Sequence, residues 1–181
     1  VIKGEPVKKL HAALDDPGAC ITCHDTHGSD EEKMLRQPVA DLCVMCHGAF
    51  QDGAKSVHGM NELATECTKC HSPHSSSLPR LLKTEPNAIC LSCHDRELPS
   101  AGSKPERKIP NFVAILKKKS VHPPAADFNQ GGCVGCHNGH SSPQDRLLNH
   151  SYPFDHNYNT YEPGGNGKTN TYELCFSCHN K

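Results

Sequence analysis

Every cysteine of this 181-residue chain lies in one pentapeptide, Cys-x-x-Cys-His, which occurs six times. Two thiols three positions apart on a short turn can form thioether bonds with the two vinyl groups of one porphyrin. The histidine that follows then lies under the iron as its proximal ligand. The spacing therefore predicts six covalently bound haem c groups. The thioether cysteines are Cys20, Cys23, Cys43, Cys46, Cys67, Cys70, Cys90, Cys93, Cys133, Cys136, Cys175 and Cys178, and the proximal histidines are His24, His47, His71, His94, His137 and His179.

Other uses of paired cysteines fit the pattern less well. A disulfide framework gives no reason for a histidine after every second cysteine. Structural zinc sites combine two half-sites rather than repeat six complete motifs. Thioredoxin-like redox motifs occur singly, on a βαβ background that this sequence lacks. The use of all twelve cysteines in motifs of one type therefore favours haem attachment.

The motifs are arranged in three repeats of two motifs each. The first cysteines of the paired motifs lie 23 residues apart in the first two repeats and 42 residues apart in the third, which has an insertion near 149–167. The repeats span about 1–50, 51–97 and 98–181. We expect them to form a single hexahaem domain over residues 1–181.

Each repeat also contains two histidines outside the motifs, one upstream of the first motif and one three residues after it. Six irons need six distal ligands if all are six-coordinate, and these histidines supply that number. The methionines occupy unrelated repeat positions, so we do not expect distal methionine ligands. His150 and His156, in the insertion, are expected on the surface or as supporting neighbours of a ligand. The distal candidates are His11, His27, His58, His74, His122 and His140.

The spacing also suggests which iron each histidine serves. His27 lies too close to His24 to close easily over the same porphyrin, so we expect it to serve a neighbouring haem, most simply that of Cys43 and Cys46. The upstream histidines would serve the first haem of their own repeat or a haem of another repeat. His11, in the terminal segment, is the best candidate for donation to a neighbouring subunit.

The composition does not provide for an ordinary apolar core. Hydrophobic residues make up 35% of the chain, aromatic residues 5%, and tryptophan is absent, so we expect bound porphyrins to serve as the core. The 14 glycines and 14 prolines argue against extensive sheet. We expect mostly irregular coil with short α-helices, organised around a chain of stacked haems, and little or no β-sheet. Helices should lead into the motifs over 41–47, 61–71, 87–94 and 172–179.

The repeated unit is a histidine, then Cys-x-x-Cys-His-x-x-His, an apolar pair, and a second Cys-x-x-Cys-His. Over nearly the whole chain it resembles the doubled Cys-x-x-Cys-His family of multihaem c-type cytochromes. It is also similar to subunits of the extracellular cytochrome filaments, or nanowires, of metal-respiring microbes, although the insertion departs from the pattern. The resemblance implies closely stacked haem pairs, export to the cell exterior or surface (alternatively the periplasm), and long-range electron conduction.

Bis-histidine ligation fills both axial positions, which favours low-potential electron transfer over catalysis at the iron. We therefore expect no enzyme activity. The expected partners are copies of the chain itself in a homopolymer, together with a redox protein or an extracellular acceptor. A monomeric periplasmic electron shuttle is the first alternative. A multihaem reductase is the second, and it would need one open iron.

Charge and hydropathy exclude other partners. The formal net charge is −1 and no basic patch is interleaved with aromatic residues, so we expect no nucleic acid partner. No run approaches the ~20 apolar residues of a transmembrane segment. The chain begins at Val1, and we expect a mature form whose export signal has been removed. The basic segment 104–119 is interpreted as a solvated linker, or alternatively as a docking site for the propionates of a partner or another copy.

Overall fold

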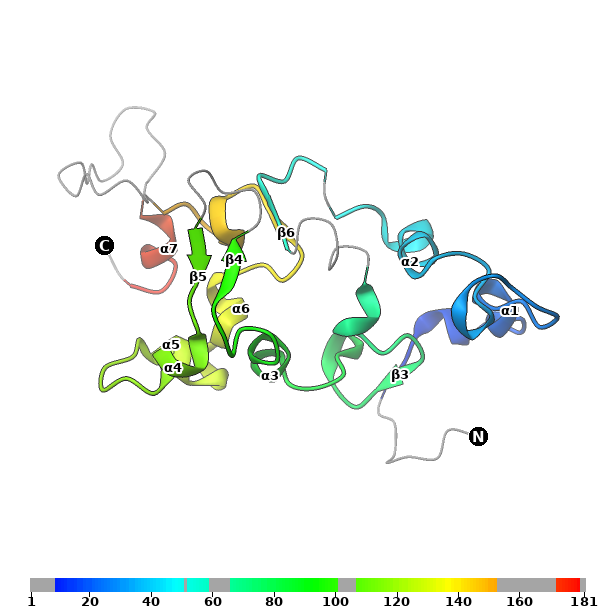
Figure 1. The fold of residues 1–181 in the computed structure, drawn as a ribbon, viewed down its shortest axis with the longest axis horizontal. Coiled ribbons are helices and arrows are strands. Elements are labelled where there is room, and N and C mark those ends of the chain that lie inside the picture. Colours follow the sequence, from blue (N-terminus) through cyan, green and yellow to red (C-terminus); the bar gives the residue numbers. More distant parts are fainter. Residues whose placement is uncertain (1–8, 51, 59–65, 101–106, 153–171, 180–181) are drawn as a thin grey trace. The chain divides into compact units, whose positions relative to one another are not determined.

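The computed structural model describes residues 9–50, 52–58, 66–100, 107–152 and 172–179 (Figure 1). The chain divides into two compact units. Unit 1 comprises Val1–Ala49 and Gly59–Ala114, and unit 2 comprises Phe50–His58 and Ile115–Lys181. The upstream part of the second repeat thus groups with the third repeat, because residues 56–57 pair as a strand with 141–142.

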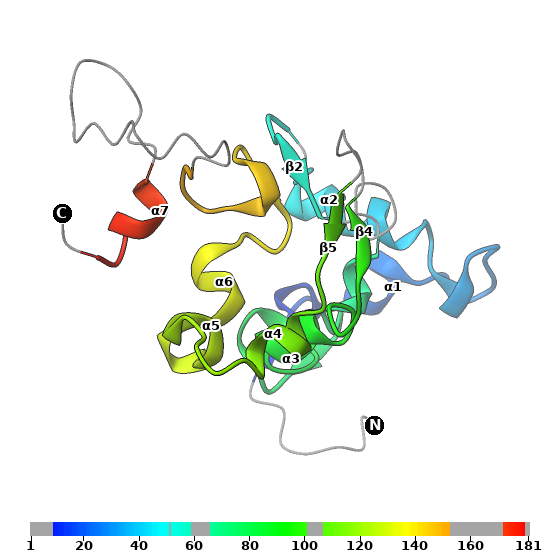
Figure 2. The same cartoon turned by 60° about the vertical axis from the view of Figure 1, so that its left-hand side comes forward.

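The described helices are short, and the longest has nine residues. The expected helices over 41–47, 87–94 and 172–179 are confirmed in part, because α2 covers the first, α3 the beginning of the second and α7 the middle of the third. Of the expected helix over 61–71, residues 61–65 lie outside the described part, and Cys67–Lys69 form a single 3-10 turn, η3. The helices are α1 Ala19–Cys23, α2 Val39–His47, α3 Pro86–Leu91, α4 Phe112–Leu116, α5 Pro123–Ala126, α6 Gly132–Cys136 and α7 Glu173–Phe176 (Figure 2).

Local sequence explains why α2 stops where the second motif ends. Pro38 fixes the backbone before the first turn, and Asp41 lies in that turn, where the helix dipole favours a negative charge. Gly48 follows His47 with a φ of 72°, which a glycine adopts without strain, and so ends the helix.

The strands form three antiparallel pairs of two strands each, so the expectation of little β-sheet is confirmed for the described residues. β1 Lys9–Leu10 pairs with β3 Ser75–Ser76, and β2 Ser56–Val57 pairs with β6 Ser141–Ser142. These two pairs join the upstream segment of one repeat to the segment behind the first motif of the next repeat. The third pair is a hairpin of β4 Leu98–Ser100 and β5 Arg107–Ile109.

Each repeat contains the same loop after its first motif, including a short 3-10 segment. Those segments are η2 Glu32–Met34, η4 Pro79–Leu81 and η6 Asp145–Leu147. In each, two successive non-glycine residues have a positive φ, between 55° and 60°. The loop closes through an antiparallel bridge from the proximal histidine to the second apolar residue, and the bridges are His24 to Leu35, His71 to Leu82 and His137 to Leu148.

A serine fastens the loop in all three repeats. Its hydroxyl donates to the carbonyl of the second apolar residue and accepts from the backbone N–H two positions on. Ser76, for example, donates to the Leu82 carbonyl at 2.5 Å and accepts from Leu78 N–H at 2.9 Å. Three separate stretches therefore fold into one unusual backbone shape.

The described residues bury little apolar side chain. Among them only Ala19 and Leu148 are buried hydrophobic residues. Ile21 and Met45, which lie between motif cysteines, are 54% and 64% exposed. The polypeptide alone thus has no extended apolar core in its described part. In the same part no helix has both the length and the hydropathy to cross a membrane.

The positive φ values predict a residue-specific effect on stability. Replacing Arg80, at φ 57°, by valine should lower the free energy of unfolding by about 1–2 kcal/mol, because a β-branched side chain clashes in the left-handed region. Glycine at the same position should be tolerated. The measurement is chemical denaturation, with exposed Arg96→Val as the control. Equal losses from valine at both positions would contradict the assigned backbone.

Candidate metal centres

Each of the three first-motif histidines makes the same type of hydrogen bond, which fixes its ring. Nδ1 of each donates to a backbone carbonyl nine residues further on, within the loop of positive φ. The pairs are His24 to the Lys33 carbonyl at 2.9 Å, His71 to Arg80 at 2.8 Å and His137 to Arg146 at 3.0 Å. With Nδ1 protonated and engaged, Nε2 carries the lone pair that can bind a metal.

Three pairs of histidine rings face each other at nearly the same distance. The ring centroids are 6.0 Å apart for His24 and His74, 6.0 Å for His11 and His47, and 6.1 Å for His122 and His179. Each pair combines one motif histidine with one of the predicted distal candidates. An iron bonded at about 2 Å to a nitrogen of each ring would separate the centroids by about 6 Å once the ring radii are added.

These pairs bear on two expectations about which iron each histidine serves. His11 faces His47, the proximal histidine of the second motif in its own repeat, and not His24. It therefore has a ring partner within its own chain, and its donation to a neighbouring subunit stays a prediction. His27 was expected at the haem of Cys43 and Cys46, whereas in this structure the ring next to His47 of that motif is His11. The cause is strand pairing, because β1 runs along β3 of the next repeat and carries His11 past the first motif.

The remaining distal candidates occupy different surroundings. Burial lowers the pKa of His58, and a hydrogen bond to the Gly139 backbone partly opposes this, so the imidazole is neutral and ready to bind a metal at neutral pH. The His140 ring stacks on Phe50 with centroids 4.6 Å apart. The side chain of His27 is 98% exposed. His150 is also exposed, and His156 lies outside the described residues.

Cysteines of successive motifs lie close together within each unit. Burial, together with the nearby thiols of Cys67 and Cys23, raises the pKa of Cys43 to about 11. Burial and Cys93 likewise raise the pKa of Cys70. In unit 2, burial and then Cys178 raise the pKa of Cys136. The sequence did not reveal these contacts between motifs, because they depend on tertiary packing.

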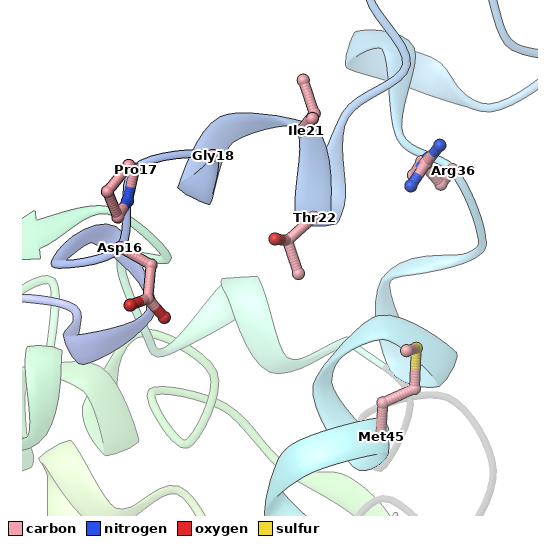
Figure 3. A pocket seen from close by; sticks show the side chains of 7 residues that line it. All are labelled: Asp16, Pro17, Gly18, Ile21, Thr22, Arg36 and Met45. Atoms are coloured by element: carbon pink, nitrogen blue, oxygen red, sulfur yellow. The ribbon is translucent and has the colours of Figure 1, made fainter.

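An open hollow of about 550 Å³ lies beside the first two motifs in unit 1. Figure 3 shows Thr22 on α1 and Met45 on α2 pointing toward the same open space. Both are residues between motif cysteines, and Ile21 also lines the hollow. An apolar group held by either motif would therefore cover side chains that the polypeptide leaves exposed.

Comparison with known proteins agrees with this geometry. The model of the doubled CXXCH motif family matches residues 11–52, 60–98 and 122–181. The chain belongs to this family. Its members are multihaem c-type cytochromes, exported proteins that bind haem c covalently and transfer electrons. No curated protein matches the chain.

The residues of the structure fit covalently bound haem. Each of the three facing pairs offers two imidazole nitrogens to one iron, and each includes the histidine of a Cys-x-x-Cys-His motif. The exposed apolar side chains beside the motifs would contact a porphyrin. The chain thus provides thiols, axial nitrogens and an apolar surface at the same places.

The pairing of His11 with His47 can be tested electrochemically. His11→Met should raise the reduction potential of one haem, because thioether ligation favours the ferrous state. The same change in a C43A/C46A background, which lacks that haem, should leave the remaining potentials unchanged. His150→Met serves as the control. Spectroelectrochemical titration provides the measurement, and an effect that persists in the double-cysteine background would contradict the pairing.

Proposed function

We propose that this chain binds six haem c groups with bis-histidine ligation and works as a low-potential electron-transfer protein. The observation that carries the proposal is the recurrence of histidine pairs 6.0–6.1 Å apart. Twelve cysteines in six motifs provide the attachment. Haem iron supplies reversible one-electron transfer when it is bound.

The side chains of this chain have three tasks in that function. The cysteines fix each porphyrin covalently, and the Nδ1 hydrogen bonds hold the first-motif imidazoles in one orientation. The distal histidines would hold the iron from its other side and thereby keep substrates and water away from it. Because histidine rather than methionine takes that position, low reduction potentials are expected.

The close packing of successive motifs supports transfer between haems. Cys43 of the second motif lies near Cys23 of the first and Cys67 of the third, and Cys70 lies near Cys93 of the fourth. In unit 2 the fifth and sixth motifs meet at Cys136 and Cys178. Groups attached at these cysteines are neighbours, so electrons can pass along the order of the motifs within each unit.

We further propose that copies of the chain assemble into a filament outside the cell that conducts over long distances. The support is the segment after His27, with which no strand pairs in the described part of the chain. A monomeric periplasmic shuttle would have the same haems but would not polymerise. No specific observation favours the reductase, because each facing pair places a second imidazole where a substrate would have to bind.

Haem counting and reoxidation kinetics test the electron-transfer proposal. Intact mass should show six bound porphyrins in the natural protein and five in the C90A/C93A variant. The reduced protein should pass electrons to an outer-sphere acceptor, and nitrite or sulfite should not accelerate its reoxidation. Fewer than six porphyrins, or turnover of either oxyanion, would contradict the proposal. Negative-stain microscopy under native conditions separates filament from shuttle.

A further inference from the structure

The chain makes the same contact between successive repeats twice. In unit 1, β1 pairs with β3 and the His11 N–H donates to the His74 carbonyl at 2.9 Å. In unit 2, β2 pairs with β6 and the His58 N–H donates to the His140 carbonyl at 2.9 Å. We call the histidine three residues after a first motif the post-motif histidine. In both cases the two residues before the upstream histidine of one repeat pair antiparallel with the two residues after the post-motif histidine of the next repeat. We call this contact the repeat seam.

The first repeat has the accepting half of a seam, and we call it the acceptor edge (residues 28–29). It follows His27 as β3 follows His74 and β6 follows His140. Its loop is already in shape, because Ser29 donates to the Leu35 carbonyl and accepts from Glu31 N–H at 3.0 Å. Within the described part of the chain, no strand pairs with it. Gly28 and Ser29 are exposed, whereas Ser142 at the equivalent place in β6 is only 3% exposed.

The third repeat has the donating half, and we call it the donor segment (residues 120–121). It precedes His122 as β1 precedes His11 and β2 precedes His58. Among the residues that the structure describes, it belongs to no strand. The chain thus has an accepting half in its first repeat and a donating half in its third, both without a strand partner in the described structure.

Opposite charges flank the two halves. In the internal seams the residue just before the upstream histidine lies opposite the residue just behind the post-motif histidine. The same register sets Val121 opposite Gly28 and Ser120 opposite Ser29. Next to these paired positions, the three lysines of 117–119 adjoin the donor segment and the three carboxylates of 30–32 adjoin the acceptor edge. All six side chains belong to exposed residues.

We propose that the donor segment of one copy adds as a strand to the acceptor edge of the next copy, with 117–119 facing 30–32. This inference rests on the proposed filament and names its contact. The occupant is a second copy because its donor segment alone combines the seam position with the complementary charges. Strand addition of this kind uses main-chain hydrogen bonds for affinity and side chains for specificity.

The seam also assigns a ligand across the contact. In the internal seam of unit 1, repeat 1 gives the strand and receives His74 of repeat 2 opposite its first proximal histidine, His24. A contact between copies with the arrangement of unit 1 would bring His27 of the next copy opposite His137 of the copy that gives residues 120–121. In the described structure neither His27 nor His137 faces another ring. Donor and acceptor are different surfaces, so the contact is heterologous and can repeat without closing.

Charge reversal tests the contact without touching the ligands. Two variants reverse the charges: K117E/K118E/K119E beside the donor segment (donor-reversed) and D30K/E31K/E32K beside the acceptor edge (acceptor-reversed). Each should assemble at least about tenfold more weakly than the natural protein at low salt, because the attraction between the two sides becomes repulsion. A 1:1 mixture of the two should assemble again, because the donor side of each variant carries the charge opposite to the acceptor side of the other. The control K55E/K83E/K108E makes the same charge change elsewhere and should assemble normally. Sedimentation velocity and negative-stain microscopy provide the readout.

Electron paramagnetic resonance follows the ligand independently. When either charge-reversed variant is measured alone, one haem in six should be high-spin, and this haem should become low-spin when the two variants are mixed. His27→Ala should keep that haem high-spin in every state. A natural protein that remains monomeric, a mixture that does not assemble, or a separated variant with all haems low-spin would overturn the inference. Six porphyrins and unchanged outer-sphere electron transfer in these variants would show that the proposed electron-transfer function survives such a failure.

Discussion

The hydrogen bond from a first-motif histidine to a carbonyl nine residues away is the interaction on which each repeat depends. It ties the metal-binding ring to the loop, and the loop in turn holds two residues in the left-handed region. Such residues cost of order 1–2 kcal/mol each unless the surroundings impose them. The fastening serine and the bridge to the second apolar residue provide that constraint. Strain in the backbone is thus retained where an imidazole must point in one direction.

The same loop also joins the repeats. The segment behind the post-motif histidine leaves the loop as a short strand, and it accepts the upstream strand of the repeat before it. This contact fixes the post-motif histidine of one repeat beside the first motif of another, as His74 beside His24 shows. Ligand sharing and chain packing are therefore one arrangement. A haem bound there would be held by two repeats, which explains how a chain whose described part has so few buried apolar residues can form a defined structure.

The sequence was sufficient for the chemistry and insufficient for the connections. The motif spacing and the histidines at fixed offsets predicted every member of the three facing pairs as a ligand, because covalent attachment imposes a strict local pattern. The proximity of His11 to His47 could not be predicted, since two-residue strands such as Ser75–Ser76 have no period that a sequence can show. The positive φ of Lys33 or Arg80 was equally hidden, because no glycine marks it. The helices α1 and α6, which pass through motif cysteines, lack the capping signals that would have predicted them.

The internal seams carry fewer charges than the two halves that lack a strand partner in the described structure, and this difference is what assembly between copies would require. Within a chain, covalent connection holds the two halves of a seam at a high effective concentration, so no attraction over distance is needed. Accordingly the three residues after β3 are uncharged, and those after β6 include one charge, Asp145. Between separate copies the halves must meet by diffusion, and complementary charge raises the rate and selects the partner. The lysines of 117–119 and the carboxylates of 30–32 lie at the two halves that lack a strand partner in the described structure, where such steering would be useful.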